Sequence, residues 1–265
     1  MGPAGLRRHR GARPALRGAC LLRPRATLAR LPLDRRAGRG GPAEPAVTRR
    51  LVLVRHGRTA WNLEGRAQGH TDVGLDETGV AQARAMAPVI GAMAPDALWS
   101  SDLARARQTA EHVATATGLE ARYDARLREF DVGERAGLTI PEFAERYPEA
   151  YESWRAGHIT GGVPGAETPE MVIDRMVPAL HEIWDATGPD QTTVVISHGA
   201  CLKICLVAFL GWPEEVGNSL RGLDNCGWVV LEDEGDGRGI RLASYNETAH
   251  PAVHGPDFAS EAPVG

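Results

Sequence analysis

Two histidines stand at the ends of apolar runs that are far apart in the sequence. The runs are LVLVRHG at residues 51–57 and VVISHG at residues 194–199, and in each the histidine is followed by glycine. Such runs are typical of buried parallel strands, and ligands bind just beyond the carboxyl ends of these strands. We therefore expect His56 and His198 in one crevice. A histidine beside an arginine, with glycine allowing close approach of the backbone, suits the handling of a phosphoryl group.

The segments around these histidines alternate between strand-like and helix-like patterns from residue 51 onward, which predicts an α/β fold. The last two strands flank the turn-rich segment 232–239, as in a hairpin. We expect six strands, at residues 51–54, 97–99, 120–123, 193–196, 227–231 and 240–244.

Helices are predicted between these strands from capping residues and apolar spacing. Asp76 can cap a helix that Pro88 should kink or end, and Ser100-Ser101-Asp102 is a capping sequence for a second helix that Gly118 ends. Further helical segments are expected at 139–187, interrupted by the glycine-rich stretch 161–165, and at 199–210.

Charge is distributed unevenly along the 265 residues. Residues 1–50 carry 13 arginines and two acidic residues, a net charge of +11, whereas residues 51–265 carry 17 basic and 32 acidic residues, a net charge of −15. An acidic body is not typical of nucleic-acid binding. The best apolar run, Ile204–Leu210, has seven residues, and a membrane span needs roughly 18. We therefore expect no nucleic-acid partner and no membrane span.

The four cysteines lack CxxC spacing and are typical of buried thiols in a reducing compartment. Together with the charge pattern, they predict a soluble, cytoplasmic protein. The cysteines are Cys20, Cys201, Cys205 and Cys226.

The arginine-rich head, residues 1–50, is treated apart from the fold. It lacks the apolar core of a secretory signal and the serines of a typical mitochondrial presequence, and its composition predicts a disordered segment. Arginine outnumbers lysine 29 to 1 across the chain, as in a GC-rich genome, so translated upstream DNA would resemble this head and the start is expected near Val47. A nucleic-acid-binding arm stays open as an independent function, which salt-dependent DNA binding would reveal. The polar segment 251–265 is predicted to be a disordered tail, which leaves residues 51–250 as the domain.

Five segments in order carry a family resemblance: LVLVRHGRTAWN, GRAQGHTDVGL, SSDLARARQTA, LREFDVG and VVISHGA. Together they resemble the histidine phosphatase (phosphoglycerate-mutase-like) superfamily, and the similarity runs from Leu51 to about Asn246. The resemblance implies a three-layer sandwich in which helices flank a mostly parallel central sheet.

The resemblance also implies a role for each matching residue. His56 matches the nucleophile that takes the phosphoryl group, and Glu129 matches the proton donor. Arg55, Arg105 and His198 match a cationic clamp. No metal and no cofactor are implied. The candidate substrate-binding residues are Asn62, Gln68, Gly57, Thr59 and Gly199.

The chemistry of phosphoryl transfer supports these roles independently. Negative charge spreads over three equatorial oxygens, so cations and hydrogen-bond donors must surround them. Arginine supplies fixed bidentate geometry, and a neutral imidazole is a competent nucleophile at pH 7. Glu129 must carry a proton to protonate the leaving alkoxide, and the resulting carboxylate can then activate water.

Taken singly, each residue has an ordinary structural interpretation. His56 could be a turn residue, Arg55 and Arg105 could form surface ion pairs, and Asn62 could cap a turn. The joint occurrence of all of them in the family's order favours the catalytic interpretation.

Four positions depart from the family's pattern. Arg135 stands where a tryptophan is common and Arg58 where Glu or Gln is frequent, and both are candidates for reshaping contacts with the substrate. Asp76 replaces a threonine cap, and Gly74 replaces a proline.

The favoured function is a phosphomonoesterase that hydrolyses a small phosphorylated metabolite, a sugar phosphate or glycerate-phosphate derivative, through phosphohistidine. A cofactor-dependent phosphoglycerate mutase is the first alternative, although mutases of this family carry an extra basic insert and only 68 residues separate Glu129 from His198. A phosphate-binding regulatory protein that has lost catalysis is the second.

The substrate is specified least by the sequence. Residues 223–228 and 245–246 look similar to the ends of actinobacterial phosphatases of this superfamily, including those that act on glucosyl-3-phosphoglycerate. An α-ribazole phosphate and other sugar phosphates stay open as substrates. The oligomeric state also stays open, with a homodimer among the alternatives.

Overall fold

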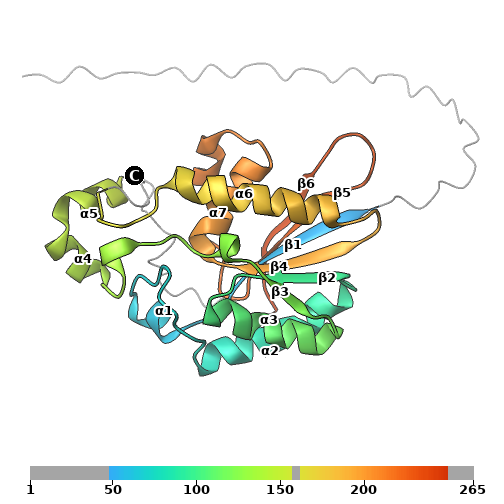
Figure 1. Cartoon of the computed structure of the whole chain (residues 1–265), viewed down its shortest axis with the longest axis horizontal. Coiled ribbons are helices and arrows are strands. Elements are labelled where there is room, and N and C mark those ends of the chain that lie inside the picture. The colour runs from blue at the N-terminus through green and yellow to red at the C-terminus, as the bar shows by residue number, and fades with distance from the viewer. Residues whose placement is uncertain (1–47, 157–161, 250–265) are drawn as a thin grey trace, which may run out of the picture. The chain divides into compact units, whose positions relative to one another are not determined.

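The computed structural model describes residues 48–156 and 162–249 (Figure 1). Several expectations lie outside these residues: the start near Val47, nearly all of the predicted head, the tail at 251–265, Cys20 and Gly161.

Six strands form one sheet in the order β3-β2-β4-β1-β5-β6. The four strands β3, β2, β4 and β1 are parallel neighbours, whereas β5 is antiparallel to both β1 and β6. The predicted mostly parallel α/β sheet is therefore confirmed, with an antiparallel hairpin at one edge. The strands are β1 (Arg49–Arg55), β2 (Ala97–Ser100), β3 (Ala121–Tyr123), β4 (Thr192–Ser197), β5 (Trp228–Asp233) and β6 (Arg241–Glu247).

The first strand begins two residues before the predicted position. Arg49 and Arg50 belong to β1 because their backbone pairs with β5 and, at Arg50, also with β4. Their side chains also have partners, since the Arg50 Nε lies 2.7 Å from Glu232 and the Arg49 guanidinium lies over the Trp184 ring. The end of the predicted arginine-rich head is thus part of the sheet.

Helices cover both faces of the sheet and make three layers (Figure 1). Alternate residues of β1 explain the two faces, because Leu51 and Leu53 belong to the core under α6 and α7, and Val52 and Val54 to the core over α2 and α3. The three-layer sandwich is confirmed. These helices are α2 (Glu77–Ala92), α3 (Ala104–Thr117), α6 (Pro169–Ala186) and α7 (Gly199–Phe209).

Two details of the helices differ from the expectations. Of the two outcomes expected at Pro88, an end of the helix is excluded: α2 continues to Ala92, because Pro88 is exposed while Ala87 and Ile90 stay buried in the core. Helix α3 begins after Leu103, whose side chain makes no cap. The first free N–H, that of Ala104, instead donates to Asp72 Oδ1 at 2.6 Å.

The segment between β3 and α6 carries two short helices, α4 (Ile140–Arg146) and α5 (Pro148–Arg155), which lie beside the sandwich (Figure 1). They have a small apolar core of their own, which includes Phe143 and Trp154. A short α1 (Ala60–Glu64) follows β1. Among residues 48–156 and 162–249 there are also three 3₁₀ turns, at Ala125–Leu127, Gly133–Arg135 and Glu214–Ser219.

Three of the predicted buried thiols, those of Cys201, Cys205 and Cys226, are buried and free. Burial raises the pKa of the Cys205 and Cys226 thiols to about 12, so both stay protonated. Within residues 48–156 and 162–249, no helix has the length and apolar character needed to cross a membrane.

Candidate active site

The two histidines of the sequence motifs meet because β1 and β4 are parallel neighbours. Arg55 pairs with Ser197 in the register, so the next residues, His56 and His198, leave the sheet at the same edge. Their ring centroids lie 5.1 Å apart. Helix α2 follows on one face of the sheet and α7 on the other, so a crevice opens at the ends of these strands, where α/β folds bind ligands.

The His56 ring is held in one tautomer. Its Nδ1 lies 2.7 Å from the carbonyl oxygen of Gly57, and because a carbonyl can only accept, Nδ1 carries the proton and Nε2 keeps its lone pair. Burial, with Arg105 and Arg55 nearby, holds the pKa of His56 well below its usual range. The imidazole is therefore neutral at pH 7, as a nucleophile must be.

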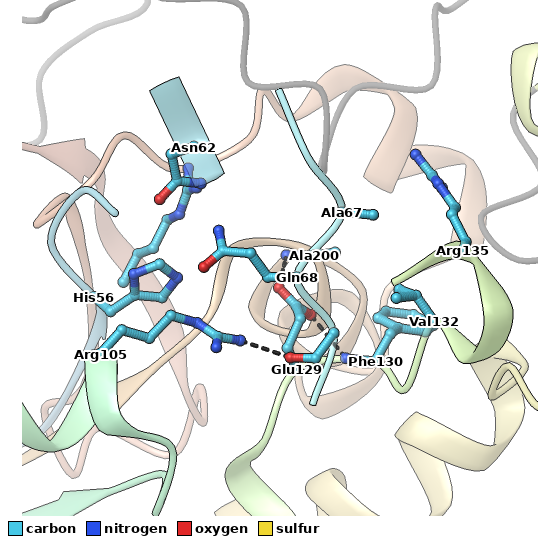
Figure 2. A pocket seen from close by; sticks show the side chains of 12 residues that line it. His56, Asn62, Ala67, Gln68, Arg105, Glu129, Phe130, Val132, Arg135 and Ala200 are labelled. Carbon is cyan, nitrogen blue, oxygen red and sulfur yellow. Dashed lines mark hydrogen bonds between the residues drawn. The ribbon is translucent and has the colours of Figure 1, made fainter. Parts of the chain in front are cut away.

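Arg55 and Arg105 place two buried positive charges beside His56. The Arg55 Nη1 donates to the carbonyl oxygen of Leu223 at 2.6 Å, and the Arg105 guanidinium donates to the carbonyl oxygens of Thr71 and Gly69 at 3.0 and 2.8 Å. Burial lowers the pKa of each arginine to about 10, so both remain charged at neutral pH. Figure 2 shows the Arg105 guanidinium beside the His56 ring at one end of a pocket.

His198 lies behind this pair as a neutral group, which corrects its expected place in a cationic clamp. Arg105 Nε donates to His198 Nδ1 at 3.1 Å, so the ring proton is on Nε2, which donates to Ser101 Oγ at 2.8 Å. Complete burial and the nearby Arg105 hold the pKa of His198 well below its usual range. Its visible effect is to orient the Arg105 guanidinium.

Glu129 reaches the pocket from the loop before α4. Its carboxylate accepts hydrogen bonds from the backbone N–H groups of Phe130, Ala200 and Cys201 at 3.0, 3.1 and 2.9 Å, the last two at the start of α7 (Figure 2). Two of these three donors belong to the first turn of α7, so the carboxylate is anchored to the start of that helix. The group is therefore held firmly at the pocket wall.

Thr59 orients the two neutral side chains of the pocket. Asn62 Oδ1 accepts from the Thr59 N–H at 3.1 Å, and Gln68 Oε1 accepts from the Thr59 hydroxyl at 3.0 Å. Because both oxygens are engaged, both amide NH₂ groups are left to donate toward the pocket. Asn62 also completes the capping box of α1, so its ordinary and functional interpretations hold together.

The two predicted glycines act through close packing rather than by lining the pocket. A Cβ at Gly57 would lie 2.6 Å from the carbonyl oxygen of Gly79, and a Cβ at Gly199 would lie 3.1 Å from Arg55 Nε. Gly57 thus lets the loop after β1 approach α2, and Gly199 leaves room for the Arg55 guanidinium.

The empty space of the pocket, counted with the solvent at its mouth, is about 490 Å³. Six of the ten predicted site residues line it, whereas His198, Thr59, Gly57 and Gly199 support it from behind. The lining residues are Arg55, His56, Asn62, Ala67, Gln68, Gly69, Arg105, Glu129, Phe130, Val132, Arg135 and Ala200.

The two arginines that depart from the family's pattern have different positions. Arg58 is not among the residues that line the pocket, and its guanidinium is engaged elsewhere: its Nε pairs with Asp76 at 2.8 Å and its Nη2 donates to Thr78. Arg135 lines the pocket opposite His56 and is almost fully buried (Figure 2). Burial lowers its pKa to about 10, and the side chain stays charged at pH 7.

Residues that hold the site together were missed by the sequence analysis. Arg175 on α6 donates to the carbonyl oxygen of Glu129 at 2.8 Å and forms an ion pair with Glu167, and His70 contacts the same carbonyl at 2.8 Å. Asn225 donates to the carbonyl oxygen of His56 at 3.1 Å. Nothing in the local sequence marks these side chains, because their partners come from distant segments.

Comparison with known proteins decides the family. The model of the histidine phosphatase superfamily (branch 1) matches residues 51–248. The chain belongs to this superfamily. It is thus a phosphatase of the histidine phosphatase class, in agreement with the resemblance carried by the five sequence segments.

Two curated relatives illustrate the range of histidine phosphatases to which the chain is similar. It is 36% identical over 189 residues to the glucosyl-3-phosphoglycerate phosphatase of Mycolicibacterium vanbaalenii, a match that covers 69% of this chain and 84% of the relative. It is 35% identical over 207 residues to the probable phosphoglycerate mutase GpmB of Cronobacter sakazakii, a match that covers 70% of this chain and 92% of the relative.

Solved structures agree with the fold. A mycobacterial glucosyl-3-phosphoglycerate phosphatase in complex with VO3 superposes with a TM-score of 0.68 at 34% identity, over 76% of this chain and all of that one. The same mycobacterial phosphatase has been solved with inorganic phosphate, and that structure superposes with a TM-score of 0.66.

Proposed function

We propose that this chain is a phosphomonoesterase that hydrolyses a small phosphorylated metabolite through a phosphohistidine at His56. The observation that carries the proposal is the neutral His56 ring, whose Nε2 keeps its lone pair between the buried cations Arg55 and Arg105. A phosphate-binding protein without catalysis would not need an imidazole held in this tautomer. The catalytic domain would comprise residues 51–250.

In the first step, Nε2 of His56 attacks phosphorus while the bond from phosphorus to the alcohol oxygen breaks. Arg55 and Arg105 would stabilise the charge on the equatorial oxygens, and the amide groups of Asn62 and Gln68 would donate to the same oxygens. In our proposal His198 acts through Arg105, by fixing the direction of its guanidinium.

The leaving alcohol needs a proton, which we assign to Glu129. Three backbone N–H groups hold its carboxyl group at the pocket wall, where it can reach the oxygen of a leaving alcohol. After the alcohol leaves, the carboxylate would take a proton from water, whose oxygen attacks phosphorus and releases phosphate and neutral His56.

The substrate that we propose is a glycerate-phosphate derivative such as glucosyl-3-phosphoglycerate. Support comes from the named activity of two mycobacterial relatives. Their sequence identity to this chain is 36% for the Mycolicibacterium vanbaalenii protein and 34% for the protein solved with VO3. The test is a panel of phosphorylated metabolites given to the purified protein, with released phosphate measured. A kcat/KM for glucosyl-3-phosphoglycerate far above that for α-ribazole phosphate or hexose phosphates supports the proposal, and a preference for either of those overturns it.

A mutase activity is the second candidate, because the GpmB relative is nearly as similar as the phosphatase relative. Incubation with 3-phosphoglycerate and catalytic 2,3-bisphosphoglycerate separates the two. Release of free phosphate with little isomerisation is the result we expect, whereas rapid isomerisation with little phosphate would assign the chain as a mutase.

A further inference from the structure

Arg135 is a buried cation that the proposed phosphoryl chemistry does not use. It lies on the pocket wall across from His56, with Glu129 and Val132 between them (Figure 2). The phosphoryl group already has Arg55 and Arg105 at the His56 end of the pocket. A third arginine at the other end therefore needs a separate explanation.

No carboxylate in residues 48–156 or 162–249 forms an ion pair with Arg135, and its buried Nε has no hydrogen-bond partner there. Only 6% of the residue is exposed. The guanidinium carbon lies 4.3 Å from the centroid of the Phe143 ring and 5.1 Å from that of Trp154. Aromatic faces stabilise a cation in part, but they leave the N–H donors at the edge of the guanidinium plane unused.

Burying a charge is costly unless a partner of opposite charge is present. The arrangement therefore fits an anionic group that arrives with the ligand. We propose that Arg135 binds a carboxylate on the substrate, so that this enzyme selects phosphate esters of hydroxy acids over phosphate esters of neutral alcohols. This inference rests on the proposed phosphatase function and narrows its substrate class.

A carboxylate fits this position better than a second phosphoryl group does. The planar guanidinium matches a planar carboxylate with two parallel hydrogen bonds. A second phosphoryl group would bring about two negative charges to one arginine, and Val132 and Ala67, which lie on the same side of the pocket, offer no further donor side chain (Figure 2). A phosphorylated hydroxy acid carries its phosphoryl group and its carboxylate at different ends. The pocket likewise has Arg55 and Arg105 at one end and Arg135 at the other (Figure 2).

The decisive test compares two substrates that differ at one group. 3-Phosphoglycerate carries a carboxylate where glycerol 3-phosphate carries a hydroxymethyl group. For Arg135→Met, which keeps the aromatic packing apolar, we expect kcat/KM for 3-phosphoglycerate to fall roughly 10- to 100-fold, mostly through KM, the range for hydrogen bonds to a charged group. The kcat/KM for glycerol 3-phosphate should change less than about threefold, and Arg135→Lys should retain part of the selectivity.

Arg146→Met is the matched control, since Arg146 is an exposed arginine of the same region that pairs with Glu134. It should leave kcat/KM for both substrates unchanged.

Equal losses of kcat/KM for both substrates in Arg135→Met would overturn the inference and assign Arg135 to packing alone. A wild-type enzyme that does not prefer the carboxylate ester would also overturn it. Binding of the same two esters to His56→Ala by calorimetry gives the comparison without turnover. If p-nitrophenyl phosphate is not cleaved by the wild type, the proposed phosphatase function fails, while this binding comparison still decides the role of Arg135.

Discussion

Replacing Glu129 by Gln tests the proton donor with the smallest change in shape. In the structure one oxygen of Glu129 accepts from Phe130 and Cys201 and the other accepts from Ala200 at 3.1 Å. In the glutamine variant the amide oxygen can accept from the N–H groups of Phe130 and Cys201. Its NH₂ group then faces the N–H of Ala200, and because both groups are donors, no hydrogen bond forms between them. The loss of one charge-assisted hydrogen bond predicts a decrease of about 1.5–3 kcal/mol in the free energy of unfolding.

The effect on catalysis should depend on the leaving group. General acid catalysis contributes about 10²–10⁴-fold, so kcat/KM of Glu129→Gln for an alkyl phosphate such as glycerol 3-phosphate should fall by that factor. For p-nitrophenyl phosphate the loss should be far smaller, because a stable phenolate leaves without a proton. Steady-state kinetics with both esters, alongside urea unfolding, measures both effects.

Glu134→Gln is the matched control, because Glu134 is an exposed carboxylate of the same loop that accepts from the Tyr147 hydroxyl and does not line the pocket. It should leave kcat/KM for both esters within about twofold, far below the change expected for a catalytic acid. Equal losses on alkyl and aryl esters in Glu129→Gln would refute the assignment and require another acid.

Three further predictions concern the histidines, a glycine and the head. Burial holds the pKa of His56 and His198 below the value near 6.5 of the unfolded chain, so near and below that pH the unfolded chain binds more protons than the folded one. The free energy of unfolding should therefore fall, as the pH is lowered from 7.5 to 5.5, by up to about 1.4 kcal/mol per pH unit for each histidine. A free energy of unfolding that stays constant over this range in urea titrations would contradict this. Gly57→Ala places a Cβ 2.6 Å from a backbone oxygen and should lower the free energy of unfolding by about 1–3 kcal/mol. Gly91→Ala is the control, because its Cβ meets nothing within 3.6 Å, and it should raise the free energy of unfolding by about 0.5–1 kcal/mol. Equal midpoints of urea unfolding for the two variants would count against the packing argument. Removing residues 1–46 should leave the melting temperature and turnover essentially unchanged, and a large drop in either would show that the head packs on the domain.

The fold was predictable from the sequence where burial is periodic. The run 51–54 alternates between the two cores, so its strand, its parallel partner and the histidines after them could be predicted. The continuation of α2 past Pro88 could not be predicted in this way, because whether a proline ends a helix depends on the packing of the residues on either side, here Ala87 and Ile90. The start of α3 also depended on a distant residue, Asp72.

The candidate site was predictable as a set of residues, but not in its electrostatics. His198 was expected to be cationic, yet its neutral state follows from complete burial beside Arg105, which no local pattern reveals. Arg58 and Arg135 looked equivalent as departures from the family's pattern. Only the three-dimensional structure separates them, since Asp76 holds Arg58 away while aromatic rings hold Arg135 at the pocket.

The central claim is that His56 carries the phosphoryl group, and trapping that intermediate tests it most directly. Wild-type protein mixed with ³²P-labelled substrate and quenched in alkaline denaturant should retain one base-stable, acid-labile phosphate, which peptide mass spectrometry assigns to His56. His56→Ala should retain no label and no turnover, because alanine offers no nucleophile, although Arg55 and Arg105 still bind the ester. Label on another residue, or substantial turnover by His56→Ala, would contradict the account.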